Sequence, residues 1–164
     1  MSAQAEGGIV LQDETPDSDC APRIDPKAAK FRLLLTHSPI HRWGVYAGEA
    51  IGAGQKIIEY TGERISRVAT KRRYTERPHN YLFTLDSYWT LDGAVGGSGA
   101  EYINHSCEPN AYAEVKQERI FYHALRDIRP GEELTLDYRF EKDVDRVECR
   151  CGTAACRGTI NLKK

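Results

Sequence analysis

The sequence has almost no net charge and no long apolar segment. Its 23 Lys and Arg residues are balanced by 24 Asp and Glu residues, so the formal net charge is −1. A chain without a positive excess gains no general attraction to nucleic acid or to anionic membranes. No apolar run approaches the roughly 20 residues that a membrane-spanning helix needs. We therefore expect neither direct nucleic-acid binding nor contact with a membrane.

Two common sequence signals are also missing. The N-terminus has no basic segment followed by an apolar core, so it does not resemble a secretory signal. No G-x-G-x-x-G motif joins a strand to a helix, which argues against a dinucleotide-binding fold. Because disulfides are typical of secreted proteins, we expect the five cysteines to be reduced thiols or metal ligands. These absences favour an intracellular globular protein.

The composition changes near residue 26. Residues 1–26 are polar and acidic, and we predict a disordered tail in which Cys20 is a free thiol. The remainder is long enough for one domain with a hydrophobic core. It contains short apolar segments bounded by Gly, Pro, Asp or Asn, a pattern that predicts strands. The strand candidates are residues 31–35, 43–47, 56–60, 81–85, 88–91, 111–115, 120–125 and 134–138.

One helix is predicted, from Ser66 to about Arg77, with Ser66 as its N-cap. Val68 and Ala69 fall on one stripe of this helix, and the opposite face is basic. The basic face is either a solvated surface or a contact for an acidic partner. Many short strands with one helix, and no regular alternation of strands and helices, predict a mainly β fold with few short helices.

A polar run, Asn104-His105-Ser106-Cys107-Glu108-Pro109-Asn110, interrupts the apolar segments. Asn and Ser side chains compete with the backbone for hydrogen bonds, and Pro109 removes a backbone donor. The run is therefore a poor helix and a poor strand. Its place inside a core-forming region indicates a functional site, and the alternative is a plain turn beside a buried histidine.

Three cysteines near the C-terminus have the tight spacing of a metal site. Cys149, Cys151 and Cys156 would provide thiolates, and Zn²⁺ prefers four sulfur or nitrogen ligands in a tetrahedron. Cys20, Cys107 and the five histidines compete for the fourth position, and Cys107 is the best candidate because it lies in the polar run. Four protein ligands would make the site structural rather than hydrolytic. The alternative is a set of unrelated reduced thiols.

Taken together, these segments resemble the motifs of SET-domain protein-lysine N-methyltransferases that carry a post-SET zinc segment. The resemblance runs from about Phe31 to Leu162. It rests, in order, on residues 43–47, 60–63, 104–110, 131–138 and 149–158. It implies small curved β-sheets and a C-terminal pseudoknot, in which the C-terminal segment threads past the polar run. The implied domains are a SET domain at 27–140 and a post-SET zinc-binding segment at 141–164.

The resemblance also implies a reaction and its residues. SET domains transfer a methyl group from S-adenosyl-L-methionine to a lysine of a protein substrate, here a histone tail or another basic protein. His41, Arg42 and Trp43 fall where the first motif contacts this cofactor. Asn104 and His105 fall where the family holds its adenine and amino-acid parts.

The tyrosines and cysteines acquire roles in the same way. Tyr138 takes the place of the catalytic tyrosine, and Tyr81 that of a second catalytic tyrosine that lines the lysine channel and contacts the cofactor. Leu136 takes the place of a substrate-channel residue that is usually Phe or Tyr. The implied zinc ligands are Cys107, Cys149, Cys151 and Cys156.

The residue types suit this chemistry independently of the resemblance. Methyl transfer from a sulfonium is an in-line displacement, and correct orientation of the reactants can supply much of the barrier reduction. The lysine must be neutral to attack, and an aromatic channel that removes water lowers the pKa of its ammonium group.

Some positions depart from the family pattern and leave alternatives open. Arg42 stands where the family often has Gly, and Glu101 stands where an Arg commonly contacts the cofactor. Glu101 favours a second hypothesis, a catalytically weak or inactive SET-fold module that binds a partner protein. Tyr138, Asn104 and His105 favour the enzyme. A third hypothesis, a zinc-ribbon nucleic-acid binder, lacks a basic stripe near the cysteines. We expect a monomer, cytoplasmic in a prokaryote or nuclear and on chromatin in a eukaryote.

Overall fold

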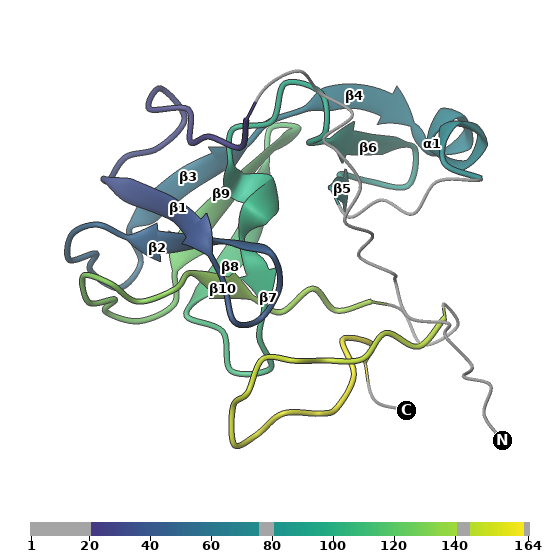
Figure 1. Cartoon of the computed structure of the whole chain (residues 1–164). Coiled ribbons are helices and arrows are strands. Elements are labelled where there is room, and N and C mark those ends of the chain that lie inside the picture. The colour runs from purple at the N-terminus through teal and green to yellow at the C-terminus, as the bar shows by residue number, and fades with distance from the viewer. Residues whose placement is uncertain (1–20, 76–80, 141–144, 163–164) are drawn as a thin grey trace, which may run out of the picture.

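The computed structural model describes residues 21–75, 81–140 and 145–162, and its architecture is mainly β (Figure 1). The predicted tail up to Cys20 lies outside the described residues. The strands are β1 (Leu33–His37), β2 (Trp43–Ala47), β3 (Lys56–Tyr60), β4 (Glu63–Ser66), β5 (Leu82–Thr84), β6 (Trp89–Asp92), β7 (Asn104–His105), β8 (Ala111–Lys116), β9 (Arg119–Ala124) and β10 (Thr135–Leu136). The described part also contains the α-helix α1 (Arg67–Arg73) and the 3-10 helix η1 (Ala100–Tyr102). The predicted class, mainly β with few short helices, is confirmed.

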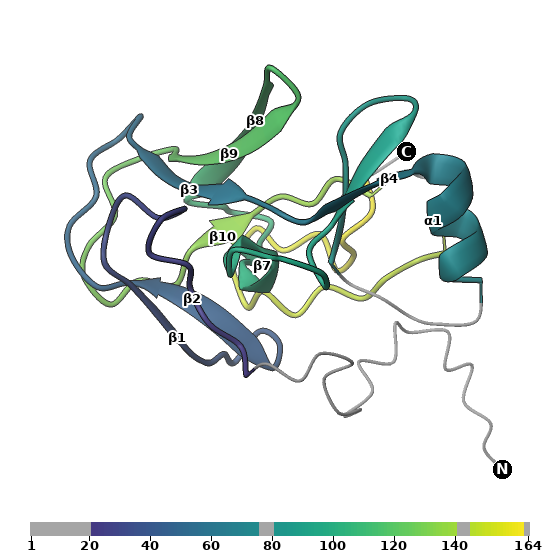
Figure 2. The ribbon, with the colours of Figure 1, turned by 90° about the horizontal axis from the view of Figure 1, so that it is seen from above.

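The strands form small sheets arranged around a central pair. Strands β1 and β2 make an antiparallel hairpin, and the orders β3-β9-β8 and β4-β6-β5 make two antiparallel sheets. Strands β7 and β10 pair in parallel. Figure 2 shows this pair between the β1–β2 hairpin and the other two sheets. A short parallel pair therefore occupies the middle of the domain.

Branched aliphatic side chains from these layers meet in one core, and burying them drives the layers together. Ile57 and Ile58 are consecutive and both fully buried, which an ideal strand with alternating faces does not allow. The pairing of β3 with β9 shifts register between Lys56 and Ile58, and this irregularity turns both side chains inward. Other fully buried residues are Ile51, Ile103, Ile120, Ile128 and Leu134. Ile103 fixes the chain in the core directly before β7.

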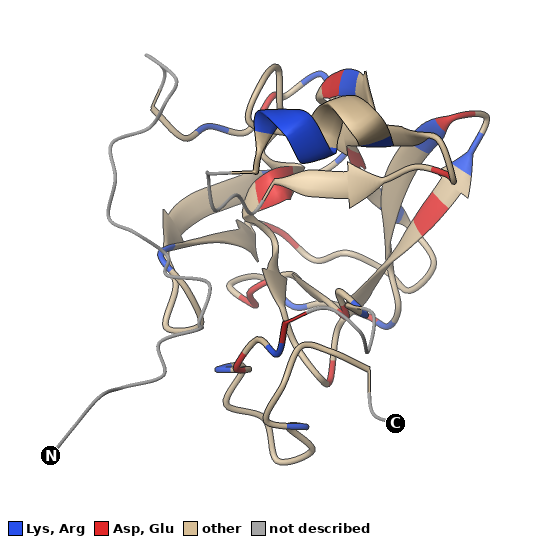
Figure 3. Cartoon of the chain, turned by 90° about the vertical axis from the view of Figure 1, so that its right-hand side faces the viewer, with Lys and Arg blue, Asp and Glu red and all other residues tan. Residues whose placement is uncertain are grey.

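The predicted helix is shorter than expected, and the expected apolar stripe is not its buried face. Ser66 caps the helix as predicted, since its hydroxyl accepts a hydrogen bond from the Ala69 N–H at 3.1 Å. The helix ends at Arg73 rather than near residue 77, and Val68 is 71% exposed. Arg73 ties the helix down through an ion pair with Glu63 at 2.5 Å. An ion pair at its C-terminal end thus holds the short helix, and Figure 3 shows basic residues in this helix. Among the described residues, no helix is both long and apolar enough to cross a membrane.

Strands β4 and β7 were not predicted from the sequence. Strand β4 pairs with β6, which lies about twenty-five residues further along, and β7 pairs with β10, about thirty residues further. Neither segment has an alternating apolar pattern of its own. Each becomes a strand because a distant segment supplies its hydrogen-bonding partners, and local pattern does not contain that information.

Residues 21–26, which the sequence analysis assigned to the tail, contact the domain. The Asp25 N–H donates to Ser98 O at 2.8 Å, and Ile24 packs against the core. Gly99 has φ +98, and a Cβ at this position would lie 2.6 Å from Ile24 Cδ1, so this site requires glycine. Contacts with the domain therefore begin before the predicted boundary at residue 27.

Candidate active site and metal centre

The pairing of β7 with β10 brings the polar run beside Tyr138. The Ser106 N–H donates to Leu136 O at 2.9 Å, which continues the parallel ladder. The Tyr138 N–H then donates to His105 Nδ1 at 3.1 Å, and the two rings meet edge to face with centroids 5.6 Å apart. Two predicted site residues that lie 33 positions apart in sequence are thus joined by one hydrogen bond.

The Tyr138 hydroxyl has a fixed protein partner. It donates to Ile103 O at 2.5 Å. Burial raises the pKa of Tyr138 above its usual range, and the neighbouring Tyr81 and Glu133 raise it further. The phenol is therefore protonated at neutral pH, and its proton points at a backbone carbonyl.

Tyr81 lies near Tyr138 within a group of aromatic rings. Its ring meets the Tyr102 ring edge to face, with centroids 5.5 Å apart. Its backbone carbonyl accepts a hydrogen bond from the Tyr60 hydroxyl, and burial raises the pKa of the Tyr81 phenol. Leu136 is only 4% exposed and belongs to the core cluster against which Tyr138 packs.

The first motif, His41 to Trp43, is held against β7 by one side chain. Asn104 Nδ2 donates to His41 O at 3.2 Å and to Trp43 O at 2.9 Å. Between them, Arg42 has φ +35, a conformation that favours glycine. Burial, with smaller effects from the charges of Arg42 and Arg150, lowers the pKa of His41 to about 4. The neutral imidazole keeps Nε2 buried without a hydrogen-bond partner among the described residues.

Glu133 connects the same elements and was missed by the sequence analysis. Its Oε1 accepts hydrogen bonds from the Ser38 hydroxyl at 2.7 Å and from Asn104 Nδ2 at 2.9 Å. Its Oε2 accepts from the Tyr46 hydroxyl at 3.1 Å. A Cβ at Gly44 would lie 2.4 Å from Glu133 Oε1, so the carboxylate needs glycine at that position. The only sequence signal was the place of Glu133 inside the 131–138 segment, which is compatible with an exposed side chain.

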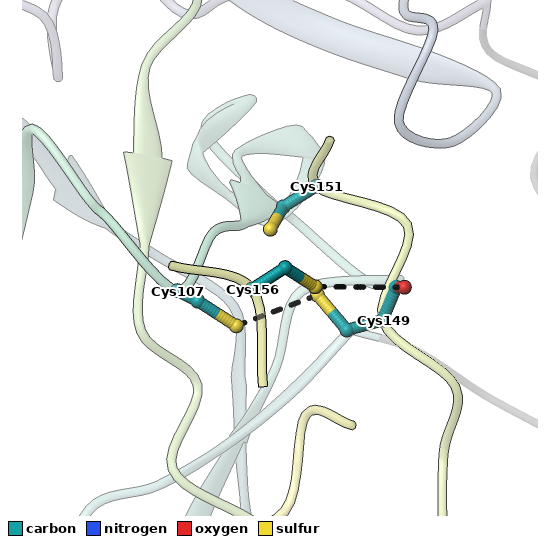
Figure 4. A group of neighbouring side chains, drawn as sticks. All are labelled: Cys107, Cys149, Cys151 and Cys156. Atoms are coloured by element: carbon teal, nitrogen blue, oxygen red, sulfur yellow. Dashed lines mark hydrogen bonds between the residues drawn. The ribbon is translucent and has the colours of Figure 1, made fainter. Parts of the chain in front are cut away.

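The four cysteines proposed as ligands come together as a cluster (Figure 4). The sulfur atoms of Cys107, Cys149, Cys151 and Cys156 all lie within 4.8 Å of one another, and Cys107 Sγ is 3.6 Å from Cys149 Sγ. A tetrahedral ion with bonds of about 2.3 Å to sulfur would separate its ligands by about 3.8 Å. The cluster can therefore hold a metal ion, with Cys107 as the only member outside the C-terminal segment.

The thiols of the cluster differ in acidity. Burial raises the pKa values of Cys107 and Cys149. Burial acts in the same direction on Cys151, but hydrogen bonds from the Cys107 backbone and from Thr153 lower its pKa to about 6. A metal binds the thiolate form, so a cation at this site competes with protons.

Glu101 lies under the glycine-rich loop of residues 93–99. The Gly99 N–H donates to Glu101 Oε2 at 2.8 Å. A Cβ at Gly97 would lie only 2.3 Å from Glu101 Oε1, so the loop closes tightly over the carboxyl group. Burial raises the pKa of Glu101 from its ordinary value of 4.5 to about 7, although backbone hydrogen bonds oppose the shift.

Comparison with known protein families matches residues 42–139 to the SET domain. The chain belongs to the SET domain family. The matched segment begins in the first motif and ends directly after Tyr138, and it includes β7, β10 and Cys107. The family resemblance expected from the sequence is confirmed.

Curated relatives extend the match toward both ends of this SET-domain chain. A Neurospora crassa protein named as a histone-lysine N-methyltransferase, H3 lysine-4 specific, is 41% identical over 157 residues, covering 88% of this chain and 12% of the relative. A Saccharomyces cerevisiae protein of the same name is 40% identical over 144 residues, covering 80% of this chain and 13% of the relative. The Caenorhabditis elegans histone-lysine N-methyltransferase set-2 is 38% identical over 144 residues, covering 82% and 10%. The chain thus spans only 10–13% of the length of these relatives.

Proposed function

We propose that this SET-domain chain is an S-adenosyl-L-methionine-dependent protein-lysine N-methyltransferase. The environment of Tyr138 carries the proposal. Its hydroxyl proton is committed to Ile103 O, and its backbone is fixed on His105. The phenolic oxygen keeps lone pairs that can accept a hydrogen bond from a lysine amine. A hydroxyl with this arrangement can orient an amine without removing its proton.

Orientation and desolvation are the main contributions of the protein. Because burial raises the pKa of Tyr138, the phenol is a poor general base at neutral pH. A lysine that enters between Tyr81 and Tyr138 would lose water, which lowers the pKa of its ammonium group and exposes the nitrogen lone pair. The cofactor supplies an electrophilic methyl group on a sulfonium. Precise alignment of the nitrogen with the methyl carbon can then lower the activation free energy by several kcal/mol. In well-oriented systems this reduction reaches about 7–11 kcal/mol.

The residues proposed to hold the cofactor fit a polar ligand. The buried Nε2 of His41 lacks a partner among the described residues and can hydrogen-bond a ligand. Arg42 and Trp43 adjoin it, and we assign both to the same site. The Asn104 side chain is engaged by His41 O, Trp43 O and Glu133, so its contribution is to hold the first motif in place. His105 and Tyr81 complete the proposed cofactor residues.

The metal proposed for the cysteine cluster is a structural Zn²⁺ held by Cys107, Cys149, Cys151 and Cys156. Four thiolates leave no open position, so the ion would fasten residues 145–162 to the polar run and would not activate water. Cys107 is the ligand that makes this link, because it alone comes from the SET-domain side. Zinc retention is expected to weaken as the pH falls, because protons compete for the thiolates.

We propose a histone as the protein substrate, and lysine 4 of histone H3 as the first target to test. Support comes from the names of the relatives, which specify H3 lysine 4 in N. crassa and S. cerevisiae. With this substrate, we propose that the protein acts in the nucleus, on chromatin. We propose a monomer as the functional form of this chain.

Transfer of radiolabelled methyl groups to histones and to a cell lysate tests the proposed activity. The wild type is expected to label a histone, and Tyr138→Phe is expected to lose most of the label while still binding the cofactor. Folded, zinc-loaded wild type that transfers no label to any protein would overturn the proposal.

A second function, a partner-binding module without catalysis, is favoured by one observation. Glu101 places a carboxyl group beneath the glycine-rich loop, at the position where SET domains commonly have an Arg that contacts the cofactor. A module would bind a histone tail in the absence of the cofactor and would never label it. The same assay, combined with a binding measurement on the histone peptide, separates the two functions.

A further inference from the structure

Arg157 makes a two-pronged contact next to Tyr138. Its Nη1 donates to Asp137 Oδ2 at 2.9 Å and its Nη2 to Asp137 Oδ1 at 2.8 Å. The two side chains are only 17% and 22% exposed. Nη2 also donates to Ile160 O at 3.2 Å, within the C-terminal segment. A bidentate, half-buried pair of this kind fixes both distance and angle, unlike an exposed ion pair.

The backbone of the same residue contacts the cysteine cluster. The Arg157 N–H donates to Cys107 Sγ at 3.3 Å. Arg157 therefore touches a cluster sulfur with its main chain and the residue before Tyr138 with its side chain. A single residue therefore links the cluster to Asp137.

A second connection runs from the cluster to Tyr138 through His105. The Tyr138 N–H can only donate, so His105 Nδ1 accepts its hydrogen bond, and the neutral imidazole carries its proton on Nε2. Nε2 lies 3.5 Å from Cys107 Sγ, in position to donate to the sulfur. The two connections leave the same sulfur atom and end on neighbouring residues, at the Asp137 carboxylate and the Tyr138 N–H.

We propose that Arg157 is a positioning residue that clamps Asp137 and Tyr138 to the cysteine cluster, so that a bound metal sets the place of the Tyr138 hydroxyl. This inference rests on the proposed methyltransferase function. Four thiolates on one ion hold Cys107 rigidly against the C-terminal segment. The Arg157–Asp137 pair and His105 then hold Tyr138 in a fixed position relative to Cys107. The Tyr138 hydroxyl needs this position because it must lie at hydrogen-bond distance from the lysine amine.

The chain contains a control for this clamp. Arg150 also adjoins ligand cysteines, Cys149 and Cys151, and also pairs with a carboxylate. Its partner Glu148 is on the surface, and both side chains are 70% exposed. Arg150→Lys and Glu148→Gln therefore make the same chemical changes close to the metal ligands, without touching Asp137.

The kinetic test compares Arg157→Lys and Asp137→Asn with these controls. Each clamp variant is expected to lower kcat by about tenfold to 100-fold, the range caused by a small misplacement of reacting groups. Zinc content is expected to stay at one ion per chain, and the cofactor Kd to change by less than about threefold. The double variant should be no slower than the slower single variant, because both changes break one interaction. The positioning role would be overturned if kcat stayed unchanged in the clamp variants, or if both clamp variants lost zinc. It would also be overturned if the fold-decrease in kcat of the double variant equalled the product of the two single decreases.

An NMR titration tests the clamp without catalysis. Zn²⁺ is added to the metal-free 164-residue chain while the Tyr138 amide and His105 ring signals are followed. In the wild type and in Arg150→Lys, both sets of signals are expected to shift in step with one equivalent of zinc. In Arg157→Lys, the Tyr138 shift should be reduced while zinc still binds, and an undiminished Tyr138 shift overturns the proposal. Because this readout needs no methyl transfer, a wild type that shows the coupling but no activity would refute the proposed function and leave the clamp standing.

Discussion

The peripheral sheets (β1–β2, β3–β9–β8 and β4–β6–β5) and the crossing region (β7, β10 and residues 145–162) are held together by different forces. The peripheral sheets pair segments with apolar inner faces, such as Val45 and Ile57, which are completely buried. The crossing region pairs two strands of two residues each, and the cysteine cluster and the side chains of Asn104 and Arg157 connect its segments to one another and to the first motif.

This difference separates stability from function. Removing a methyl group from any buried core side chain lowers the free energy of unfolding, but it leaves the geometry of the site largely intact. Removing a single hydrogen-bonding side chain in the crossing region leaves several buried partners unsatisfied at once. Asn104, with acceptors from His41, Trp43 and Glu133, is the clearest case. Substitutions in the peripheral sheets should therefore lower stability, whereas substitutions in the crossing region should lower cofactor binding or activity.

The largest expected effect follows from breaking the metal centre. Cys149→Ser removes one of four thiolates, so zinc should be lost and methyl transfer should fall by at least about 100-fold through misplacement of the site. The C-terminal segment should become sensitive to protease, whereas far-UV circular dichroism should show the peripheral sheets intact. Cys20→Ser is the matched control and should change neither zinc content nor activity. Full activity of Cys149→Ser with no zinc bound would contradict the account.

The next effect separates a site residue from a core residue. Asn104→Ala leaves carbonyls of the first motif without their partner, at a cost of about 1–3 kcal/mol. Isothermal titration calorimetry should show S-adenosyl-L-methionine binding weakened by about 5- to 150-fold. Ile57→Val should instead lower stability by about 0.5–1.5 kcal/mol and leave the cofactor Kd unchanged. Equal cofactor affinity in Asn104→Ala and wild type would remove Asn104 from the site.

A smaller effect concerns the carboxyl group of Glu101. An acid whose pKa rises on folding binds its proton more tightly in the folded state, so stability is lost as the pH rises from 4.5 to about 7. Glu101→Gln keeps an acceptor for the Gly99 N–H without the buried charge. It should stabilise the protein at pH 8 by an amount on the order of 2 kcal/mol, allowing for partial exposure, and much less at pH 5. Thermal unfolding at the two pH values is the measurement, and equal changes at both would contradict a buried ionisable carboxyl group.

The smallest effect on cofactor binding is expected from a substitution of Leu136, which should nevertheless change the number of methyl groups on the product lysine. An apolar side chain here brings no hydroxyl to restrain a partly methylated amine, so we predict products beyond monomethyl-lysine. Leu136→Tyr should shift products toward monomethyl-lysine with little change in cofactor Kd. Mass spectrometry after long incubation with excess cofactor is the test. Exclusive monomethylation by the wild type would show that another residue closes the channel.

The peripheral strands could largely be predicted from local pattern. Strands β2 and β3 coincide with the predicted segments, because each is a short apolar run ended by glycine or a turn. The cysteine cluster was also predictable, because three of its members are close in sequence and Cys107 lies in a conspicuous motif. The apolar stripe predicted at Val68 and Ala69 did not identify the buried face of α1. A seven-residue helix can be anchored by one arginine instead of an apolar face.

The connections inside the site could not be predicted. Glu133 and Arg157 look like ordinary charged residues, and their partners lie 95 and 20 positions away. Nothing in the spacing of Ser38 and Glu133, or of Asp137 and Arg157, marks them as pairs. Only the fold brings them together, and the hydrogen-bond geometry then distinguishes a half-buried clamp from a surface ion pair such as Arg150 with Glu148.

The most direct test of the central claim is the mass of a histone H3 N-terminal peptide after incubation with the zinc-loaded protein and S-adenosyl-L-methionine. We predict that the wild type adds one or more methyl groups to lysine 4, that Tyr138→Phe adds few or none, and that a peptide with arginine in place of lysine 4 stays unmodified. Methylation of the peptide by Tyr138→Phe at the wild-type rate, or an unmodified peptide with the wild type in the presence of bound cofactor, would contradict this prediction.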